Sequence, residues 1–323
     1  AAGWQGASIE LLTADASFRS YSLVTLHQKS AVPMDAAPEH EKPAAFQQVA
    51  EILAALELSA PRIYAADTTA GFLLIEYFGE RTFTRALAAG ADERALYQLA
   101  TDTLIVLHRR WDPSLGAGLT SFDGQSLPAE TELFLDWMYP ALTGSPPDDL
   151  MRERFLDAWR EVLRPAFALP PTLVLRDYHV DNMMVLADRP GVTACGLLDF
   201  QDALLGSPAY DRVSLLRAAR RDVSRDLEAA MLERYCSAFP ELDRQLFEEA
   251  YWVLGAQRTI RILGVFVRLD RRDGKPAYLA HLPRLWRLLD RLLTRPEVAP
   301  VAAWFERYLP AAARQVPLKG VAA

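Results

Sequence analysis

Cysteine is scarce in this sequence, and no long apolar run is present. Cys195 and Cys236 are the two cysteines among 323 residues, and each lies among apolar neighbours without the spacing of a metal-binding motif. We therefore expect two buried, reduced thiols. No apolar stretch approaches the roughly 18 residues of a membrane-spanning helix, and no secretion signal pattern is evident. These absences predict a cytoplasmic protein that has no membrane partner.

Basic charge is also in short supply. The formal net charge is −7 at pH 7, which argues against a nucleic-acid partner. A hydrophobic content of 51% over 323 residues provides for a large core, and this length favours two lobes. We expect a monomer that acts on a small molecule.

An acid–amide–acid pattern stands out in the second half of the chain. An apolar run leads to Asp177, Asn182 follows five residues later, and Asp199 follows a second apolar region. A carboxylate at a strand end can receive a proton from an attacking hydroxyl group. An amide oxygen and a second carboxylate suit Mg²⁺, which prefers oxygen ligands. The pattern predicts a phosphoryl-transfer site with Asp177 as the base and with Asn182 and Asp199 on the magnesium ions that bridge the ATP phosphates.

The segments around this pattern favour the catalytic interpretation. Asp and Asn residues at this spacing commonly form ordinary turns. Here, however, the apolar runs 183–186 and 195–198 flank a polar, glycine-containing stretch at 187–192, which is typical of a hairpin. Such a hairpin would bring Asn182 and Asp199 to the same end of one ribbon.

Three motifs resemble the aminoglycoside phosphotransferase/choline kinase superfamily. They are Asp177-Tyr-His-Val-Asp-Asn182, Leu197-Leu-Asp-Phe-Gln201 and Gly206-Ser-Pro-Ala-Tyr-Asp211. Upstream, Leu104-Ile-Val-Leu-His108 and Leu58-Ser-Ala-Pro-Arg-Ile-Tyr64 extend the resemblance over nearly the whole chain. It implies an α+β, protein-kinase-like bilobal fold with a small β-rich N-terminal lobe and a large, mainly helical C-terminal lobe.

Within the superfamily, the chain is most similar to bacterial kinases of cell-wall recycling. The segments 15–21, 34–38, 175–182 and 268–275 carry this narrower resemblance. Those enzymes phosphorylate the anomeric C1 hydroxyl of N-acetylmuramic acid and N-acetylglucosamine. The resemblance implies ATP and Mg²⁺ as cofactors and an amino sugar as the substrate. An aminoglycoside or another small molecule is the alternative acceptor.

The expected lobes divide at the segment after residue 77. Residues 1–77 are predicted to bind the nucleotide, and residues 78–323 to carry the catalytic and acceptor-binding groups. Hydrophobic periodicity predicts strands at 8–12, 21–26, 30–34, 62–66 and 72–76, with a helix at 43–56. It predicts further helices at 82–89, 92–109, 130–139, 149–165, 210–220, 224–238, 243–269 and 279–293.

The expected nucleotide site departs from the family pattern. Its phosphate loop, residues 15–20, contains no glycine, although Ser17 and Arg19 could contact phosphate. The lysine that the family places on strand three is replaced by Met34 or Asp35. Either Arg19, Lys29 or Lys42 supplies the positive charge, or the chain is a degenerate pseudokinase that only binds a nucleotide or a sugar. The survival of the acid–amide–acid pattern favours an active enzyme.

Adenine is expected to meet the backbone of the hinge at Glu76–Phe78. Acceptor contacts are expected from the helical lobe. The long helix at 243–269 has equivalents in the superfamily that often face the acceptor pocket, and its Arg258 and Arg261 could hold the carboxylate of N-acetylmuramic acid. Glu132 and Asp136 form one polar stripe beside aromatic residues, which suits a sugar, although a solvated helix face explains the same pattern.

Three further acceptor candidates lie in or beside the catalytic loop, namely Arg176, His179 and Asp181. Arg176 could neutralise charge beside Asp177 or pair with a nearby acid. His179 could hold the loop by hydrogen bonds. Asp181 could accept hydrogen bonds from a sugar or remain a solvated loop acid.

Overall fold

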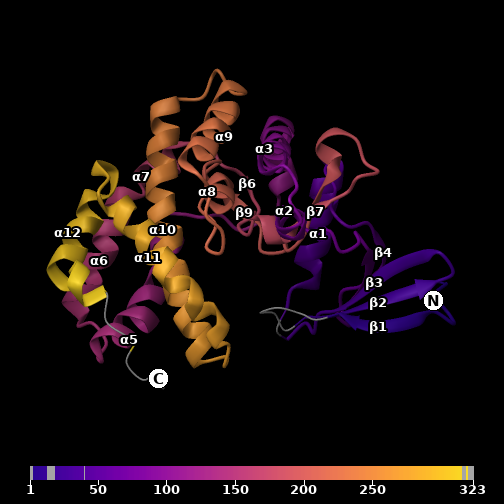
Figure 1. The fold of residues 1–323 in the computed structure, drawn as a ribbon, viewed down its shortest axis with the longest axis horizontal. Coiled ribbons are helices and arrows are strands. Elements are labelled where there is room, and N and C mark those ends of the chain that lie inside the picture. Colours follow the sequence, from indigo (N-terminus) through magenta and orange to yellow (C-terminus); the bar gives the residue numbers. More distant parts are fainter. Residues whose placement is uncertain (1–2, 13–18, 40, 315–317, 319–323) are drawn as a thin grey trace. The chain divides into compact units, whose positions relative to one another are not determined.

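The structure, a computed structural model, describes residues 3–12, 19–39, 41–314 and 318 (Figure 1). The chain forms two compact units. The first combines Ala1–Gly118 with Leu175–Ala203, and the second combines Leu119–Val174 with Leu204–Ala323. The functional division predicted near residue 77 stays a prediction.

The first unit contains a five-stranded antiparallel sheet with strand order β1-β2-β3-β5-β4. All five strands were predicted to within one residue at each end. In register, Tyr21 of β2 lies opposite Met34 of β3, and Met34 lies opposite Leu73 of β5. The strands are β1 (Ser8–Leu12), β2 (Ser20–Leu26), β3 (Lys29–Asp35), β4 (Ile63–Asp67) and β5 (Phe72–Glu76).

Helix α1 (Pro43–Ala55) follows the first three strands. Proline at its first position has a backbone angle suited to a helix start. Its apolar stripe is buried, and Phe46 from this stripe stacks on Phe200 with ring centroids 4.9 Å apart. The helix is thereby packed against the residue that directly follows Asp199.

The remaining elements of the first unit lead to the predicted hairpin. Helix α2 (Phe83–Ala88) is capped by Thr82 and α3 (Glu93–Arg110) by Asp92, whose side chains accept hydrogen bonds from backbone N–H groups in the first turn. The hairpin consists of β7 (Met183–Val185) and β8 (Cys195–Leu197), joined through a 3-10 turn at Gly191–Ala194.

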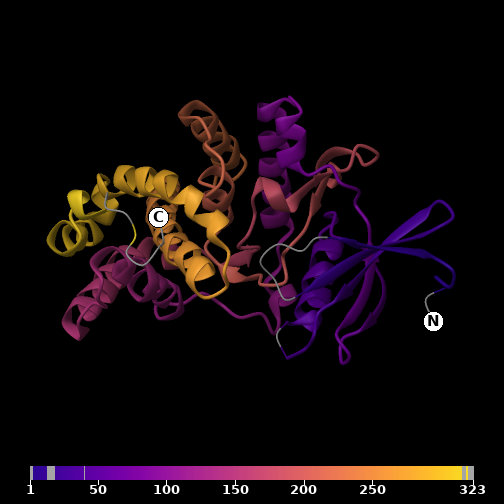
Figure 2. The ribbon, with the colours of Figure 1, turned by 60° about the horizontal axis from the view of Figure 1, so that its bottom comes forward.

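The second unit is built around the long helix α10 (Arg244–Arg271), which contacts α7, α8 and α11. A short ladder pairs β6 (Thr172–Val174) with β9 (Leu204–Gly206). Helices α6 and α12 are far apart in sequence but lie side by side in this unit (Figures 1 and 2). The other helices are α4 (Ser126–Ala129), α5 (Tyr139–Thr143), α6 (Asp149–Val162), α7 (Arg164–Ala168), α8 (Tyr210–Leu216), α9 (Arg225–Ser237), α11 (Leu282–Leu293) and α12 (Ala299–Tyr308).

Several predicted helix bounds in the second unit were wrong. The segment predicted as one helix at 130–139 contains the π-helical turn η2 (Phe134–Met138), followed by α5. Pro140 cannot donate the backbone hydrogen bond that a regular turn would need there. Pro165 likewise falls in α7, after the first helix of the predicted 149–165 segment has ended at Val162. Helix α8 stops at Leu216, and α12 was not predicted.

Helix α10 approaches the π-helical segment closely at Gly264. A Cβ atom at this position would lie 2.3 Å from the carbonyl carbon and oxygen of Leu133. Only glycine allows such backbone contact. Within the described part of the chain, no helix is both long enough and apolar enough to cross a membrane.

Candidate functional site

The hairpin β7–β8 positions two members of the acid–amide–acid pattern. Met183 pairs with Leu197 at its open end, so Asn182 and Asp199 lie next to each other just beyond the ladder. The backbone N–H of Leu198 donates to the carbonyl oxygen of Asn182 at 3.0 Å. The predicted ribbon geometry is therefore present in the structure.

Asn182 connects all three residues of the pattern. Its Nδ2 atom donates to the backbone oxygen of Asp177 at 3.0 Å and lies 3.4 Å from Oδ2 of Asp199. Because the amide nitrogen makes these contacts, the amide oxygen is left for another partner. The three residues form one cluster inside the first unit.

The backbone is strained at two positions that flank Asp177 and the hairpin end. Arg176 has φ 67° and Asp199 has φ 58°, both in the left-handed region. Non-glycine residues seldom adopt this region, and each instance costs on the order of 1 kcal/mol. Packing and hydrogen bonds of the surrounding loop must offset this cost, among them the two hydrogen bonds that the Asp199 carboxylate accepts.

The carboxylate of Asp199 is held by two donors. Its Oδ1 atom accepts from Nη2 of Arg19 at 2.8 Å and from Nε2 of Gln201 at 3.0 Å. The Asp199 side chain remains 40% exposed, whereas Arg19 is only 8% exposed. Arg19 also forms an ion pair with Glu41, with 3.5 Å between Nε and Oε2. Sequence reasoning did not identify Glu41, which lies in a polar stretch with no distinguishing pattern.

The rest of the catalytic loop is tied to nearby helices. The Tyr178 hydroxyl donates to the backbone oxygen of Ala100 in α3 at 2.7 Å. Thr84 of α2 donates to Asp181, whose other carboxylate oxygen lies 3.7 Å from Nδ1 of His179. Asp181 and His179 therefore contact each other, and Thr84 is a loop contact that the sequence pattern did not reveal.

The hinge carries an ion pair at its start. Glu76 pairs with Arg189, whose guanidinium also lies 5.1 Å from the centre of the Phe78 ring and donates to Ser59 at 3.0 Å. A Cβ atom at Gly196 would lie 2.8 Å from the Phe78 ring. Strand β8, which leads to Asp199, is thus packed directly beneath the predicted hinge.

Two other residues, Lys29 and Ser17, were predicted to contact the nucleotide. Lys29 is exposed at the first position of β3, and Met34 near its other end is only 1% exposed. Ser17 lies outside the described residues. Of the predicted cations, the described structure brings Arg19 to Asp199.

The predicted acceptor residues Glu132, Asp136, Arg258 and Arg261 belong to the second unit. Arg152 bridges both carboxylates, with 2.8 Å to Glu132 and 2.6 Å to Asp136. Arg258 is buried, with its guanidinium 5.7 Å from the centre of the Tyr210 ring. Arg261 pairs with Glu130 at 3.2 Å.

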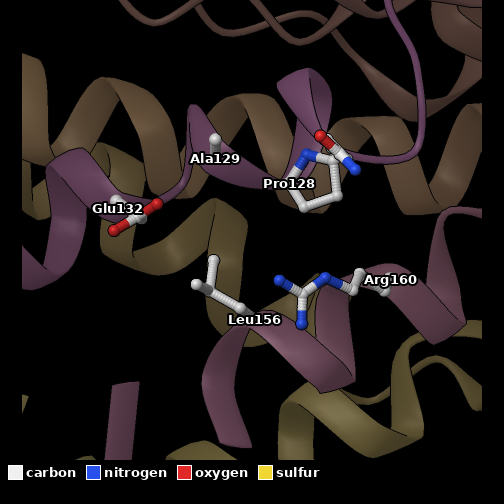
Figure 3. Close-up of a pocket in the computed structure, with 6 residues that line it drawn as sticks. Pro128, Ala129, Glu132, Leu156 and Arg160 are labelled. Carbon is white, nitrogen blue, oxygen red and sulfur yellow. The ribbon is translucent and has the colours of Figure 1, made fainter. Parts of the chain in front are cut away.

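A pocket of about 370 Å³ lies in the second unit beside Glu132 (Figure 3). Glu132 is the one predicted acceptor residue among its lining residues. In Figure 3, Pro128 lies above Arg160 across the pocket, while Leu156 forms part of its lower wall. Its full lining is Gln125, Pro128, Ala129, Glu132, Leu156 and Arg160.

The donor chemistry of the cluster fits magnesium. Mg²⁺ keeps several water ligands and usually takes one or two carboxylates together with substrate phosphates. Asp199 supplies a partly exposed carboxylate and Asn182 an amide oxygen. Among the described residues, no group of three or more His, Cys, Asp and Glu side chains could form a closed protein cage for a metal. The residues present therefore suit an open site shared with a nucleotide.

Comparison with known proteins identifies the family. The model of the phosphotransferase enzyme family matches residues 8–246. The chain belongs to this family. A protein named N-acetylmuramate/N-acetylglucosamine kinase from Caulobacter vibrioides is 40% identical over 278 residues, which cover 84% of this chain and 76% of that protein. A protein of the same name from Pseudomonas aeruginosa is 34% identical over 310 residues, covering 93% and 89%.

A solved structure supports the same fold. The ADP-bound form of an aminoglycoside phosphotransferase matches with a TM-score of 0.56 at 17% identity, covering 88% of this chain and 94% of that one. The predictions of a kinase-like α+β fold and of a phosphotransferase are thereby confirmed. The superfamily resemblance read from the sequence motifs is also confirmed.

Proposed function

We propose that this phosphotransferase is an ATP-dependent kinase that phosphorylates the anomeric C1 hydroxyl of N-acetylmuramic acid, N-acetylglucosamine or both. The observation that supports the chemistry is the cluster of Asp177, Asn182 and Asp199 at the hairpin end. The names of relatives at 40% and 34% identity support the amino-sugar acceptor. The proposal includes a monomeric, cytoplasmic enzyme without a nucleic-acid partner.

In the proposed reaction, the acceptor hydroxyl oxygen forms a bond to the γ-phosphorus of ATP. The bond between that phosphorus and the β–γ bridging oxygen breaks, and ADP leaves with the bond electrons. Asp177 receives the hydroxyl proton. An anomeric hydroxyl is more acidic than an ordinary alcohol, which makes this proton transfer easier.

Asn182 and Asp199 would hold Mg²⁺ through their oxygen atoms. The ion would neutralise charge on the phosphates. Arg19 would hold phosphate oxygens, and the backbone of Glu76–Phe78 would contact the adenine of ATP. In the acceptor site, Arg258 and Arg261 are the proposed anion contacts, and Glu132 and Asp136 are the proposed hydroxyl contacts. Arg176, His179 and Asp181 would shape the catalytic loop beside the sugar.

The test is acceptor-stimulated ADP release with Mg·ATP. The panel contains N-acetylmuramic acid, N-acetylglucosamine, kanamycin and choline, with Asp199→Ala as the inactive control. Stimulation by the N-acetyl sugars and ³¹P NMR of a phosphate on C1 are the expected results. Stimulation by kanamycin or choline alone would overturn the assignment of an amino sugar as the acceptor. The absence of nucleotide turnover with every acceptor would favour the pseudokinase alternative.

A further inference from the structure

In the family pattern, a phosphate-binding lysine on the third strand pairs with a glutamate on the first helix. This chain does not form that pair. Met34, at the expected lysine position on β3, is an almost fully buried apolar side chain. In α1, the available acid is Glu51, which is exposed and accepts a hydrogen bond from Gln47 at 2.9 Å. The sheet and helix that supply this ion pair in the family therefore supply none at these positions.

An arginine lies at the start of the neighbouring strand. Arg19 immediately precedes β2, and Tyr21 two residues later is the direct cross-strand partner of Met34. Lys29 lies at the opposite end of β3, five residues from Met34, or about 17 Å at the usual strand rise. Arg19 is thus the cation nearest to the vacated position among the predicted candidates on these two strands.

Arg19 is held as a charged group inside the first unit. Burial disfavours its charged form, but Tyr21, Asp199 and Glu41 outweigh this effect and keep the pKa of Arg19 above its ordinary value. Glu41 is itself only 15% exposed, so the ion pair is shielded from solvent. Its carboxylate binds Nε, whereas Nη2 faces Asp199.

We propose that Arg19 and Glu41 together replace the missing lysine–glutamate pair, with Arg19 binding nucleotide phosphate and Glu41 acting as its positioning residue. This inference rests on the proposed use of ATP. A guanidinium fork can hold two phosphate oxygens at once. Because Glu41 binds the Nε edge, it orients the fork beside the carboxylate that would hold the metal.

The test measures the affinity of two ligands by calorimetry in the absence of acceptor. One is a non-hydrolysable ATP analogue with Mg²⁺, and the other is adenosine. Arg19→Met should weaken binding of the analogue on the order of 10–100-fold, as expected for lost hydrogen bonds to a charged group. Glu41→Gln should weaken it less, by about 3–10-fold. Adenosine affinity should stay within about twofold, because adenosine carries no phosphate.

Two matched controls isolate the position of the charge. Lys29→Gln and Lys42→Gln each remove one positive charge and should leave affinity for the analogue within about twofold. Restoring a cation on β3 with Met34→Lys in the Arg19→Met background should recover part of the lost affinity. Thermal unfolding of each variant reports its folding.

Three results would overturn the replacement. They are wild-type affinity in Arg19→Met, an equal loss of adenosine affinity, or a larger loss in Lys29→Gln than in Arg19→Met. If the unaltered protein binds no Mg·ATP analogue, the proposed function and this inference both fail. If it binds the analogue but phosphorylates a different acceptor, the Arg19–Glu41 pair stands and only the acceptor assignment changes.

Discussion

In both units an arginine bridges two carboxylates at or beside predicted site residues, but these two clusters are built differently. In the first unit, Arg19 joins Glu41 to Asp199, three residues from separate parts of the chain. In the second unit, Arg152 joins Glu132 to Asp136, which lie one helical turn apart. The Arg19–Glu41 pair of the first cluster is shielded from solvent, and Asp199, which is 40% exposed, has a strained backbone, whereas Arg152 is 29% exposed.

This difference separates two roles for similar ion pairs. A nearby pair on one turn forms at little conformational cost and stabilises a helix surface modestly. A buried pair assembled from distant segments pays for desolvation and strain, and nothing in its local sequence requires it. We therefore expect the first cluster to serve phosphoryl transfer, and the second to combine local structure with the proposed hydroxyl contacts of Glu132 and Asp136.

The largest expected effect is the loss of activity in Asp199→Ala. Removing the carboxylate deletes the proposed metal ligand and the partner of Arg19, so acceptor-stimulated ADP release should fall to background. Asp136→Ala is the comparison variant. It removes a carboxylate that also pairs with an arginine and is a proposed acceptor contact, so it should raise KM for the sugar but keep most of the turnover at saturating sugar. Comparable loss of ATP-dependent turnover in both variants would contradict the proposed difference between the clusters.

The next effect concerns Asp177. Asp177→Asn keeps the size of the side chain but removes its basicity, so kcat should fall on the order of 10²–10⁴-fold. Affinity for the Mg·ATP analogue should change little, since the proposed metal ligands remain. Steady-state kinetics and calorimetry check both values, and an unchanged kcat would refute the assignment of Asp177 as the base.

A smaller effect is expected when the second cluster is broken. Arg152→Met removes two partly exposed ion pairs and should lower the free energy of unfolding by about 1 kcal/mol or less. Denaturant titration measures this change, and ATP affinity should be unaffected. A fall in kcat/KM for the amino sugar of more than about tenfold would instead show that Arg152 helps present Glu132 and Asp136 to the acceptor.

The smallest expected effect is a change in the rate at which a thiol reagent labels cysteine. Each unit contains one cysteine that can report it. Complete burial raises the pKa of Cys195, at the start of β8, to about 12, and burial also raises the pKa of Cys236 in α9. Both thiols should therefore react slowly with a thiol reagent at pH 8. If the nucleotide stabilises the first unit, saturating Mg·ATP analogue should slow labelling of Cys195 several-fold and leave Cys236 unchanged. Equal slowing at both cysteines would show that the nucleotide stabilises the two units together.

Much of the first unit was predictable because its signals are local. The sheet strands are short apolar runs bounded by turn residues, and each was predicted to within one residue. The hairpin after Asn182 was predictable for the same reason, since two apolar runs flank a polar stretch. The errors in the second unit fall at Pro140 and Pro165, where a proline breaks the local helical pattern, at the end of α8, and at α12, which was not predicted.

The linear pattern was sufficient to predict the acid–amide–acid residues, the hairpin that orients two of them, and the kinase-like family, because these depend on short spacings within the chain. The proposed replacement of a lysine by Arg19, just before the next strand, could not be predicted in this way. Arg19 and Asp199 are 180 residues apart, and Glu41 has no sequence feature that links it to either. Their contact exists because packing of β2, the segment before α1 and the hairpin makes a buried charge stable only where two carboxylates meet it.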